Sequence, residues 1–222
     1  MKRNYQKELE KILKQQEEKQ WIPKLFLHSC CAPCSSYVLE YLSQYFQITV
    51  FYYNPNIYPE IEYLKRVEEQ KKFIYDFQKN RSSHIDFLEG VYKKERFYEM
   101  AKGMEELPEG GERCFRCYEL RLREAAYYAK EMNMDYFTTT LSISPLKNAE
   151  KLNEIGERLA KEYGVNYLVS DFKKKNGYQR SIELSREYHM YRQDYCGCIF
   201  SMQERERQKL ERYNSNYEVI NK

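Results

Sequence analysis

Residues 24–53, KLFLHSCCAPCSSYVLEYLSQYFQITVFYY, carry the strongest indication of the fold of this chain. The stretch begins with a short apolar run (24–29) and passes into a segment whose apolar residues have helical spacing (35–45). It ends in a β-branched and aromatic run (47–53). A strand, a helix and a second strand in this order predict a βαβ unit, in which the two strands lie parallel in one sheet.

The same alternation continues through the rest of the chain. Further strands are expected at 85–88, 135–141 and 166–170, and further helices at 60–79, 95–104, 114–132, 148–163, 181–192 and 203–213. Strands that alternate with helices of this length predict a doubly wound, Rossmann-like α/β fold. Ligands of such sheets bind beyond the carboxyl ends of the strands, so we expect the cysteine-bearing and polar stretches there to share one crevice.

We expect the chain to have three parts. A single α/β catalytic domain is expected to span residues 23–213. A mostly polar N-terminal helical extension (1–22) is expected to pack loosely on it, and the polar C-terminal tail (214–222) is expected to fray.

The composition narrows the class of protein. Apolar residues at 42% indicate a folded globular chain, and a net charge of +3 excludes a strongly basic nucleic-acid coat but not a local basic face. No apolar run approaches the ~20 residues that span a bilayer, and the N-terminus lacks the apolar stretch of a signal peptide, so no membrane partner is expected. The expected location is the cytoplasm, where thiols stay reduced and clustered cysteines indicate ligands or catalysts.

All seven cysteines lie in three short clusters. The clusters are Cys30, Cys31 and Cys34; Cys114 and Cys117; and Cys196 and Cys198. Single buried cysteines are common in protein cores, but here none stands outside a cluster. The first cluster lies between a strand and a helix start, where thiolates are favoured. The Cys-Gly-Cys of the third cluster suits either an exchangeable disulfide or two ligands of one metal.

The spacing of the clusters favours an iron–sulfur centre over structural zinc. Zinc knuckles usually lie roughly 12–20 residues apart, whereas about 80 residues separate each of these clusters from the next. Four thiolates with further thiols nearby favour a [4Fe–4S] cluster beside a second redox group. Zinc remains the alternative.

The chain resembles the epoxyqueuosine reductases of the QueH family along nearly its whole length. The matching stretches are HSCCAPC (28–34), YYNPNIYPEIEYLKR (52–66), ERCFRCYELRL (112–122), TTTLSISPLKN (138–148) and DFKKKNGYQRSIELSREYHMYRQDYCGCIFS (171–201). Their joint occurrence in one order is far more specific than any one cysteine pair.

The resemblance implies an oxidoreductase that reduces epoxyqueuosine to queuosine at the wobble position of tRNA, with an iron–sulfur cluster and an electron donor. It implies that Cys30, Cys31, Cys114 and Cys117 hold the [4Fe–4S] cluster and that Cys196 and Cys198 form a redox-active pair. Cys34 is left with two alternatives, a ligand of a second iron or an extra thiol. Removal of the epoxide oxygen as water takes two electrons and two protons, and a dithiol that closes to a disulfide supplies two electrons.

Several other residues are candidates for the site. Asp194 is a candidate acid or iron ligand, with a surface carboxylate as the alternative, and His28 either donates to Cys30 or is a satisfied core histidine. The candidate tRNA-binding residues are Lys173, Lys174, Lys175 and Arg180, with Asn54 as a reader of the modified base. A solvated charged face and strand-end capping explain the same residues.

Two other functions remain open at this point. A zinc-stabilised tRNA- or nucleotide-binding protein would share the strand–loop–helix start, although this loop lacks the glycines that wrap a phosphate. A plain thiol–disulfide oxidoreductase needs only Cys196 and Cys198, and it leaves five cysteines unexplained.

Overall fold

A sheet of five parallel strands forms the centre of the protein, in the order β3-β2-β1-β4-β5. The computed structural model describes residues 3–81 and 84–220, with side chains through Tyr213. The strands are β1 (Lys24–His28), β2 (Gln47–Tyr52), β3 (Ile85–Glu89), β4 (Tyr136–Thr139) and β5 (Asn166–Tyr167). The chain starts in the middle of the sheet and winds outward in both directions, which confirms the predicted Rossmann-like α/β fold.

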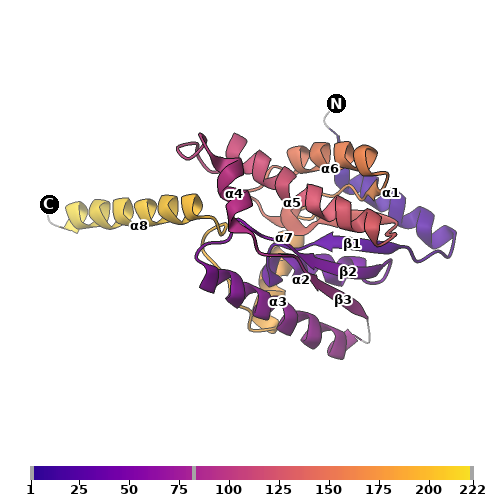
Figure 1. Cartoon of the computed structure of the whole chain (residues 1–222). Helices are drawn as coiled ribbons and strands as arrows, with labels where there is room; N and C mark the ends of the chain where they lie inside the picture. The colour runs from indigo at the N-terminus through magenta and orange to yellow at the C-terminus, as the bar shows by residue number, and fades with distance from the viewer. Residues whose placement is uncertain (1–2, 82–83, 221–222) are drawn as a thin grey trace.

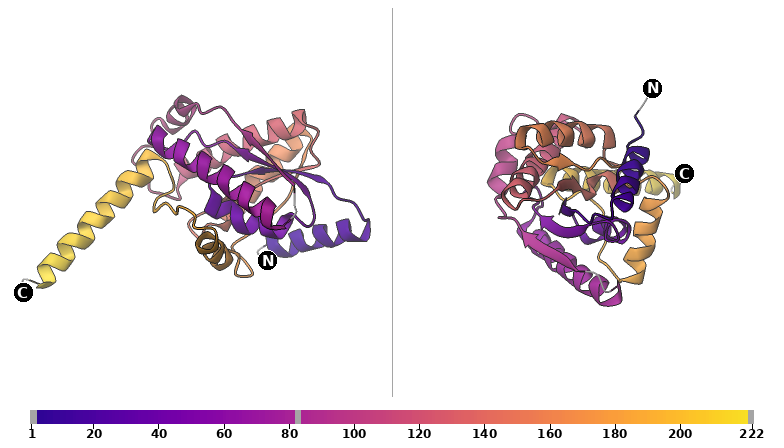
Figure 2. Two further views of the ribbon diagram at one scale, coloured as in Figure 1. Left: turned by 90° about the horizontal axis from the view of Figure 1, so that it is seen from below. Right: turned by 90° about the vertical axis from the view of Figure 1, so that its right-hand side faces the viewer.

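Helices cover both faces of the sheet (Figures 1 and 2). They are α1 (Tyr5–Glu18), α2 (Ala32–Leu42), α3 (Glu60–Arg81), α4 (Lys94–Ala101), α5 (Glu112–Glu131), α6 (Ala149–Tyr163), α7 (Gly177–Glu187) and α8 (Ile199–Ile220). Because side chains alternate along a strand, Leu25 and Leu27 of β1 pack in the core with α2 and α3, whereas Phe26 packs with α5 and α6.

Helix α1 is packed more tightly than the sequence predicted. Its side chains Leu9 and Leu13 are 0% and 3% exposed and belong to the same core cluster as Leu25 and Leu27. The expectation of loose packing was wrong, because Leu9 and Leu13 lie one turn apart and together bury one face of this otherwise polar helix. Whether residues 1–22 form a separable extension of the domain stays a prediction.

The two last helices differ in extent from those predicted. Helix α7 ends at Glu187 rather than at residue 192, because His189 takes a left-handed backbone conformation (φ 51°) that no helix continues through. Helix α8 begins at Ile199 and continues to Ile220, so the backbone of most of the tail predicted to fray is helical. The Glu-, Arg- and Gln-rich residues 203–212 are strong helix formers, and no proline or glycine follows them to end the helix before residue 220.

Helix α8 extends away from the rest of the molecule (Figures 1 and 2). Its first turns lie near the carboxyl ends of the strands, where Ser201 and Glu204 share a crevice with Cys196. No helix among the described residues combines the length and the apolar character needed to cross a membrane.

Candidate redox site

A crevice of about 570 Å³ opens at the carboxyl ends of the central strands. Its walls include Cys30 from the β1–α2 connection, Cys34 from the first turn of α2, and Cys196 from the segment before α8. Arg121 of α5 and Lys147 from the loop before α6 line it as well. The stretches that carry these residues therefore meet at one edge of the sheet, as the sequence predicted.

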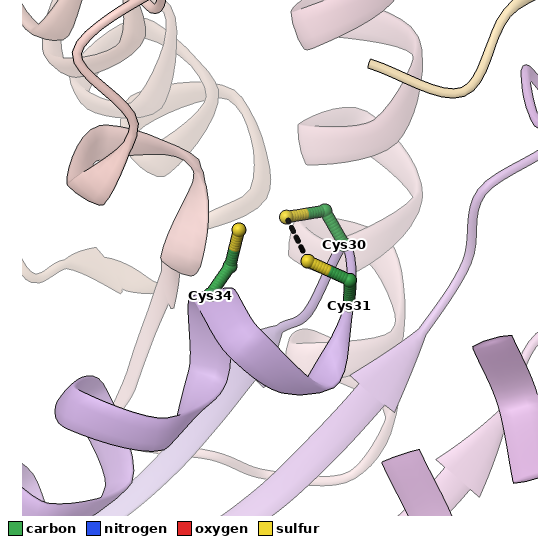
Figure 3. A group of neighbouring side chains, drawn as sticks. All are labelled: Cys30, Cys31 and Cys34. Atoms are coloured by element: carbon green, nitrogen blue, oxygen red, sulfur yellow. Dashed lines mark hydrogen bonds between the residues drawn. The ribbon is translucent and has the colours of Figure 1, made fainter. Parts of the chain in front are cut away.

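Three cysteine sulfurs gather at the start of α2 (Figure 3). The sulfurs of Cys30, Cys31 and Cys34 all lie within 4.8 Å of one another, and those of Cys30 and Cys31 are 3.9 Å apart. Strand β1 ends at His28 and α2 begins at Ala32 with Pro33 in its first turn, so the connection turns sharply between them. Within the described residues this is the one group of three or more His, Cys, Asp or Glu side chains with this spacing.

The pKa values of the three thiols are shifted in different directions. The pKa of Cys31 lies well below its usual value, because Cys30 and Cys34 donate hydrogen bonds toward its sulfur and Arg66 adds a positive charge. The hydrogen bond to Cys31 raises the pKa of Cys30 to about 11, and hydrogen bonds to Cys30 and Cys31 raise that of Cys34 well above its usual value. Cys31 is therefore the most readily ionised of the three thiols, and a bound cation or metal would favour ionisation of the whole group.

The other four cysteines surround a second, much smaller cavity of about 10 Å³. They are Cys114, Cys117, Cys196 and Cys198. Burial raises the pKa of Cys117 to about 12 and also raises the pKa of Cys198. All seven cysteines are free thiols in the structure, so the predicted redox pairing of Cys196 and Cys198 stays a prediction.

Two buried arginines lie beside the sulfurs. Arg121 is 2% exposed, and its Nη1 and Nε donate to Asn54 Oδ1 at 3.2 Å and to the Cys117 carbonyl at 3.4 Å. Arg66 is also 2% exposed, with its Nε donating to Glu62 at 2.7 Å and its Nη1 to the Cys196 carbonyl at 3.3 Å. The remaining amino group of each, Nη2, is buried and has no hydrogen-bond partner.

Lys147 is a site residue that the sequence did not single out. Its Nζ donates to Cys196 Sγ and to Glu109 Oε1, both at 3.0 Å, and the side chain is 6% exposed. Burial lowers the pKa of Lys147, but the Cys196 sulfur, Tyr118 and Glu109 outweigh burial and raise the pKa overall. Nothing in the spacing of TTTLSISPLKN distinguishes this lysine from a surface lysine, although the stretch follows a strand.

The predicted tRNA-binding residues are largely engaged in contacts within the chain. Arg180 donates to both carboxylate oxygens of Glu40, and Lys175 forms an ion pair with Glu10. Lys173 pairs with Asp171 at 3.1 Å, and Lys174 is exposed. None of the four lines the crevice.

Asn54 is buried inside the protein, where it bonds to the backbone rather than facing the crevice. Its side chain is 1% exposed, donates to the Ser29 carbonyl at 2.8 Å and accepts from Arg121. This geometry favours the structural alternative, in which Asn54 caps the strand end. Its predicted role as a reader of the base remains untested.

His28 and Asp194 differ in their relation to the sulfurs. His28 is 0% exposed, its Nε2 donates to the Tyr53 carbonyl at 3.1 Å and its Nδ1 lies 2.8 Å from Thr139 Oγ1, so it is the satisfied core histidine of the two alternatives. Asp194 lines the crevice and pairs with Lys209, which lowers the pKa of Asp194. A low pKa suits a proton donor poorly, and its predicted catalytic role stays a prediction.

The fold and the site together define an α/β protein with a thiol-lined crevice at the switch point of its sheet, the arrangement of a thiol- or metal-dependent redox protein. The family model described as "Epoxyqueuosine reductase QueH" matches residues 25–204. The chain is 47% identical to a protein of that name from Staphylococcus epidermidis over 200 residues, which cover 89% of this chain and 84% of that protein. The corresponding Staphylococcus aureus protein is 46% identical, with 89% and 83% covered.

A more distant relative also matches over most of both chains. The Thermotoga maritima protein named epoxyqueuosine reductase QueH is 36% identical over 193 residues, which cover 84% of this chain and 94% of that protein. The chain belongs to the QueH family of epoxyqueuosine reductases. It is therefore an enzyme of the oxidoreductase class.

Proposed function

We propose that this chain reduces epoxyqueuosine to queuosine at the wobble position of tRNA, with an iron–sulfur centre held by its cysteines. The observation that carries the proposal is the group of three thiols within 4.8 Å, set in a crevice that also contains Cys196. The names of the relatives support the substrate. We propose the cytoplasm as the place of reaction, since the chemistry needs reduced thiols.

The donor set of the site fits an iron–sulfur cluster. Soft thiolate ligands select zinc, copper(I) or iron–sulfur centres, and a structural zinc site needs only four ligands. Three thiols in one group and four more around the neighbouring cavity exceed that number. When bound, a [4Fe–4S] cluster would supply electrons one at a time.

The division of the seven cysteines between ligands and redox pair has two alternatives. In the first, the one implied by the family resemblance, Cys30, Cys31, Cys114 and Cys117 hold the cluster. In the second, which the grouping of the sulfurs favours, Cys30, Cys31 and Cys34 supply three ligands and the other four cysteines remain together around the small cavity. Cys34 separates the two alternatives, because it is a ligand of the cluster itself in only the second; in the first it is left as a ligand of a second iron or as an extra thiol.

The redox pair has to supply two electrons for each epoxide reduced. Deoxygenation breaks both C–O bonds of the epoxide, forms a C=C bond and releases the oxygen as water, for which it consumes two electrons and two protons. Cys196 and Cys198 supply both when they close to a disulfide, and an external donor then reduces the disulfide again. Gly197 between them has φ 129°, a conformation that L side chains rarely adopt, and both cysteines line the small cavity.

The substrate has to reach the crevice as an unpaired nucleotide. Modified bases of an anticodon loop are single-stranded and can be turned out of their stack. A crevice of about 570 Å³ is in the usual range for a site that takes one small ligand. Lys174 is exposed and is retained as a proposed phosphate contact. Lys173, Lys175 and Arg180 are proposed contacts on condition that tRNA displaces the ion pairs described above.

The proposal is tested by metal analysis of protein purified without air, on the wild type and on single Cys→Ala variants. We expect iron and acid-labile sulfide in the wild type, with loss of iron in Cys31→Ala. Cys34→Ala loses iron only in the second ligand alternative, and Cys117→Ala only in the first. Cys196→Ala is expected to keep iron and lose turnover.

Three results would count against the proposal. A colourless, iron-free wild type that still reduces epoxyqueuosine in tRNA would exclude the iron–sulfur centre. Stoichiometric zinc after anaerobic growth would favour the zinc-stabilised tRNA- or nucleotide-binding protein instead. Loss of iron in Cys196→Ala would show that Cys196 is a ligand and not part of a redox pair.

A further inference from the structure

Arg121 is a buried cation placed among sulfurs from all three cysteine clusters. The sulfurs that act on its charge are those of Cys117, Cys196 and Cys30. Arg121 also lines both the large crevice and the small cavity. A guanidinium in this position interacts with both groups of cysteines, and it is always protonated.

No carboxylate of the described residues pairs with Arg121. Its two hydrogen-bond acceptors, Asn54 Oδ1 and the Cys117 carbonyl, are neutral, and Nη2 is buried without a partner. A buried charge without a counter-ion is costly, so such a group persists where something negative compensates it. The nearby candidates are the thiolates and whatever anionic centre they hold.

Arg66 provides a comparison within the same chain. It also has an unpartnered Nη2, and the Cys31 sulfur is the strongest favourable influence on its charge. Unlike Arg121, however, Arg66 pairs with the carboxylate of Glu62 at 2.7 Å, which is itself 12% exposed. Much of its charge is therefore cancelled locally.

Lys147, which also lines both cavities and donates to Cys196 Sγ, pairs with the carboxylate of Glu109 at 3.0 Å. Of these three cations, Arg121 is the one with no carboxylate partner among the described residues.

We propose that Arg121 supplies the uncompensated positive charge that stabilises the reduced form of the sulfur-ligated metal centre, and that it thereby sets the reduction potential of that centre. The proposal rests on the proposed function, because it needs a metal centre on the thiolates. Arg121 forms no covalent bond and transfers no proton. The process that it favours is the uptake of one electron by the centre, supplied in the test by dithionite, which adds one negative charge next to the guanidinium.

The test is a redox titration of protein purified without air, followed by electron paramagnetic resonance. Arg121→Met is expected to lower the midpoint potential, and Arg121→Lys to lower it less, since the charge remains but the second amino group is lost. Glu62→Gln is expected to shift the potential in the opposite direction, upward, because it frees the charge of Arg66. Arg116→Met is the control: Arg116 lies on the same helix and pairs with Glu112 at the surface, and its removal should leave the potential unchanged.

Iron content is measured on each variant before titration. If Arg121→Met loses iron, Arg121→Gln takes its place, and Glu62→Gln still tests the sign of the effect with the arginine intact. Full iron and an unchanged potential in both an uncharged Arg121 variant and Glu62→Gln overturn the proposal. An unchanged potential with a raised KM for tRNA would show instead that Nη2 binds the substrate.

The proposed function fails in a different way. If the wild-type protein contains no iron, there is no metal centre, and both proposals fail before any variant is made. Wild-type protein that holds iron but leaves epoxyqueuosine unchanged counts against the substrate alone, because the titration needs no tRNA.

Discussion

The contact between Arg180 of α7 and Glu40 of α2 predicts that Arg180→Met destabilises the fold without weakening the binding of tRNA. Nε and Nη2 of Arg180 donate to the two carboxylate oxygens of Glu40, each at 2.8 Å. The side chains are 35% and 16% exposed. A hydrogen bond to a charged group contributes about 1.5–3 kcal/mol when it is well buried, and partial exposure reduces this, so we expect a loss of about 1–2 kcal/mol.

The assay is urea and thermal unfolding of the wild type, Arg180→Met, Glu40→Gln and the double variant. For a chain of this size 1 kcal/mol corresponds to about 2–4 °C, so Arg180→Met should lower Tm by about 2–8 °C. The double-mutant cycle should give a coupling energy of about 1 kcal/mol. Arg81 also contacts Glu40, so Glu40 keeps one cationic partner in the Arg180 variant.

The same contact predicts a dependence on pH. The pKa of Glu40 is lowered from its ordinary value of 4.5, chiefly by the hydrogen bond from Arg180. A carboxyl whose pKa is lower in the folded state adds stability above its unfolded pKa and loses it as the pH falls through the folded pKa. The difference in Tm between the wild type and Arg180→Met should therefore be complete at about pH 6 and should shrink below about pH 4.

Binding of unmodified tRNA, measured at fixed salt, decides whether Arg180 has the structural or the substrate-binding role. We expect the affinity of Arg180→Met to stay within about threefold of the wild type. Lys174→Met is the matched control for the loss of one positive charge, since Lys174 is exposed on the loop before the same helix. A large loss of affinity with unchanged stability would refute the reasoning and restore Arg180 as a phosphate contact.

Three further variants test other parts of the structure. Gly156→Ala would place its Cβ 2.3 Å from the ring of Tyr167, so we expect a loss of about 1–3 kcal/mol in urea unfolding; an unchanged midpoint would contradict the packing of α6 on β5. Leu9→Ala, in the core face of α1, should cost about 2–5 kcal/mol, whereas a cost near zero would mean that α1 is dispensable. Lys147→Met removes a charged hydrogen-bond donor to Cys196 Sγ, a contact worth about 1.5–3 kcal/mol. We therefore expect kcat to fall about 10- to 100-fold with KM nearly unchanged. A change in KM alone would speak against a role of this contact in the chemical step.

Much of the fold was predictable because its signals are local. The apolar runs and helical spacings of residues 24–53 specify a βαβ unit, and the parallel sheet follows from the repetition of that unit. The errors lie where local signals were weak. The end of α7 depends on one left-handed residue, His189, and the packing of α1 depends on two leucines that meet a core built from later segments.

The sequence by itself determined the class of fold, the three cysteine clusters and the family, because spacing along the chain and the identity of the side chains are enough for each. Only the tertiary structure decided which sulfurs lie together, Cys30 and Cys31 with Cys34 rather than with Cys114 and Cys117. It also decided that Arg121 and Lys147 are buried among sulfurs while Arg180 is held by Glu40. The physical reason is that burial and charge compensation depend on distances between segments far apart in the chain, and those distances exist only after the sheet has brought the segments together.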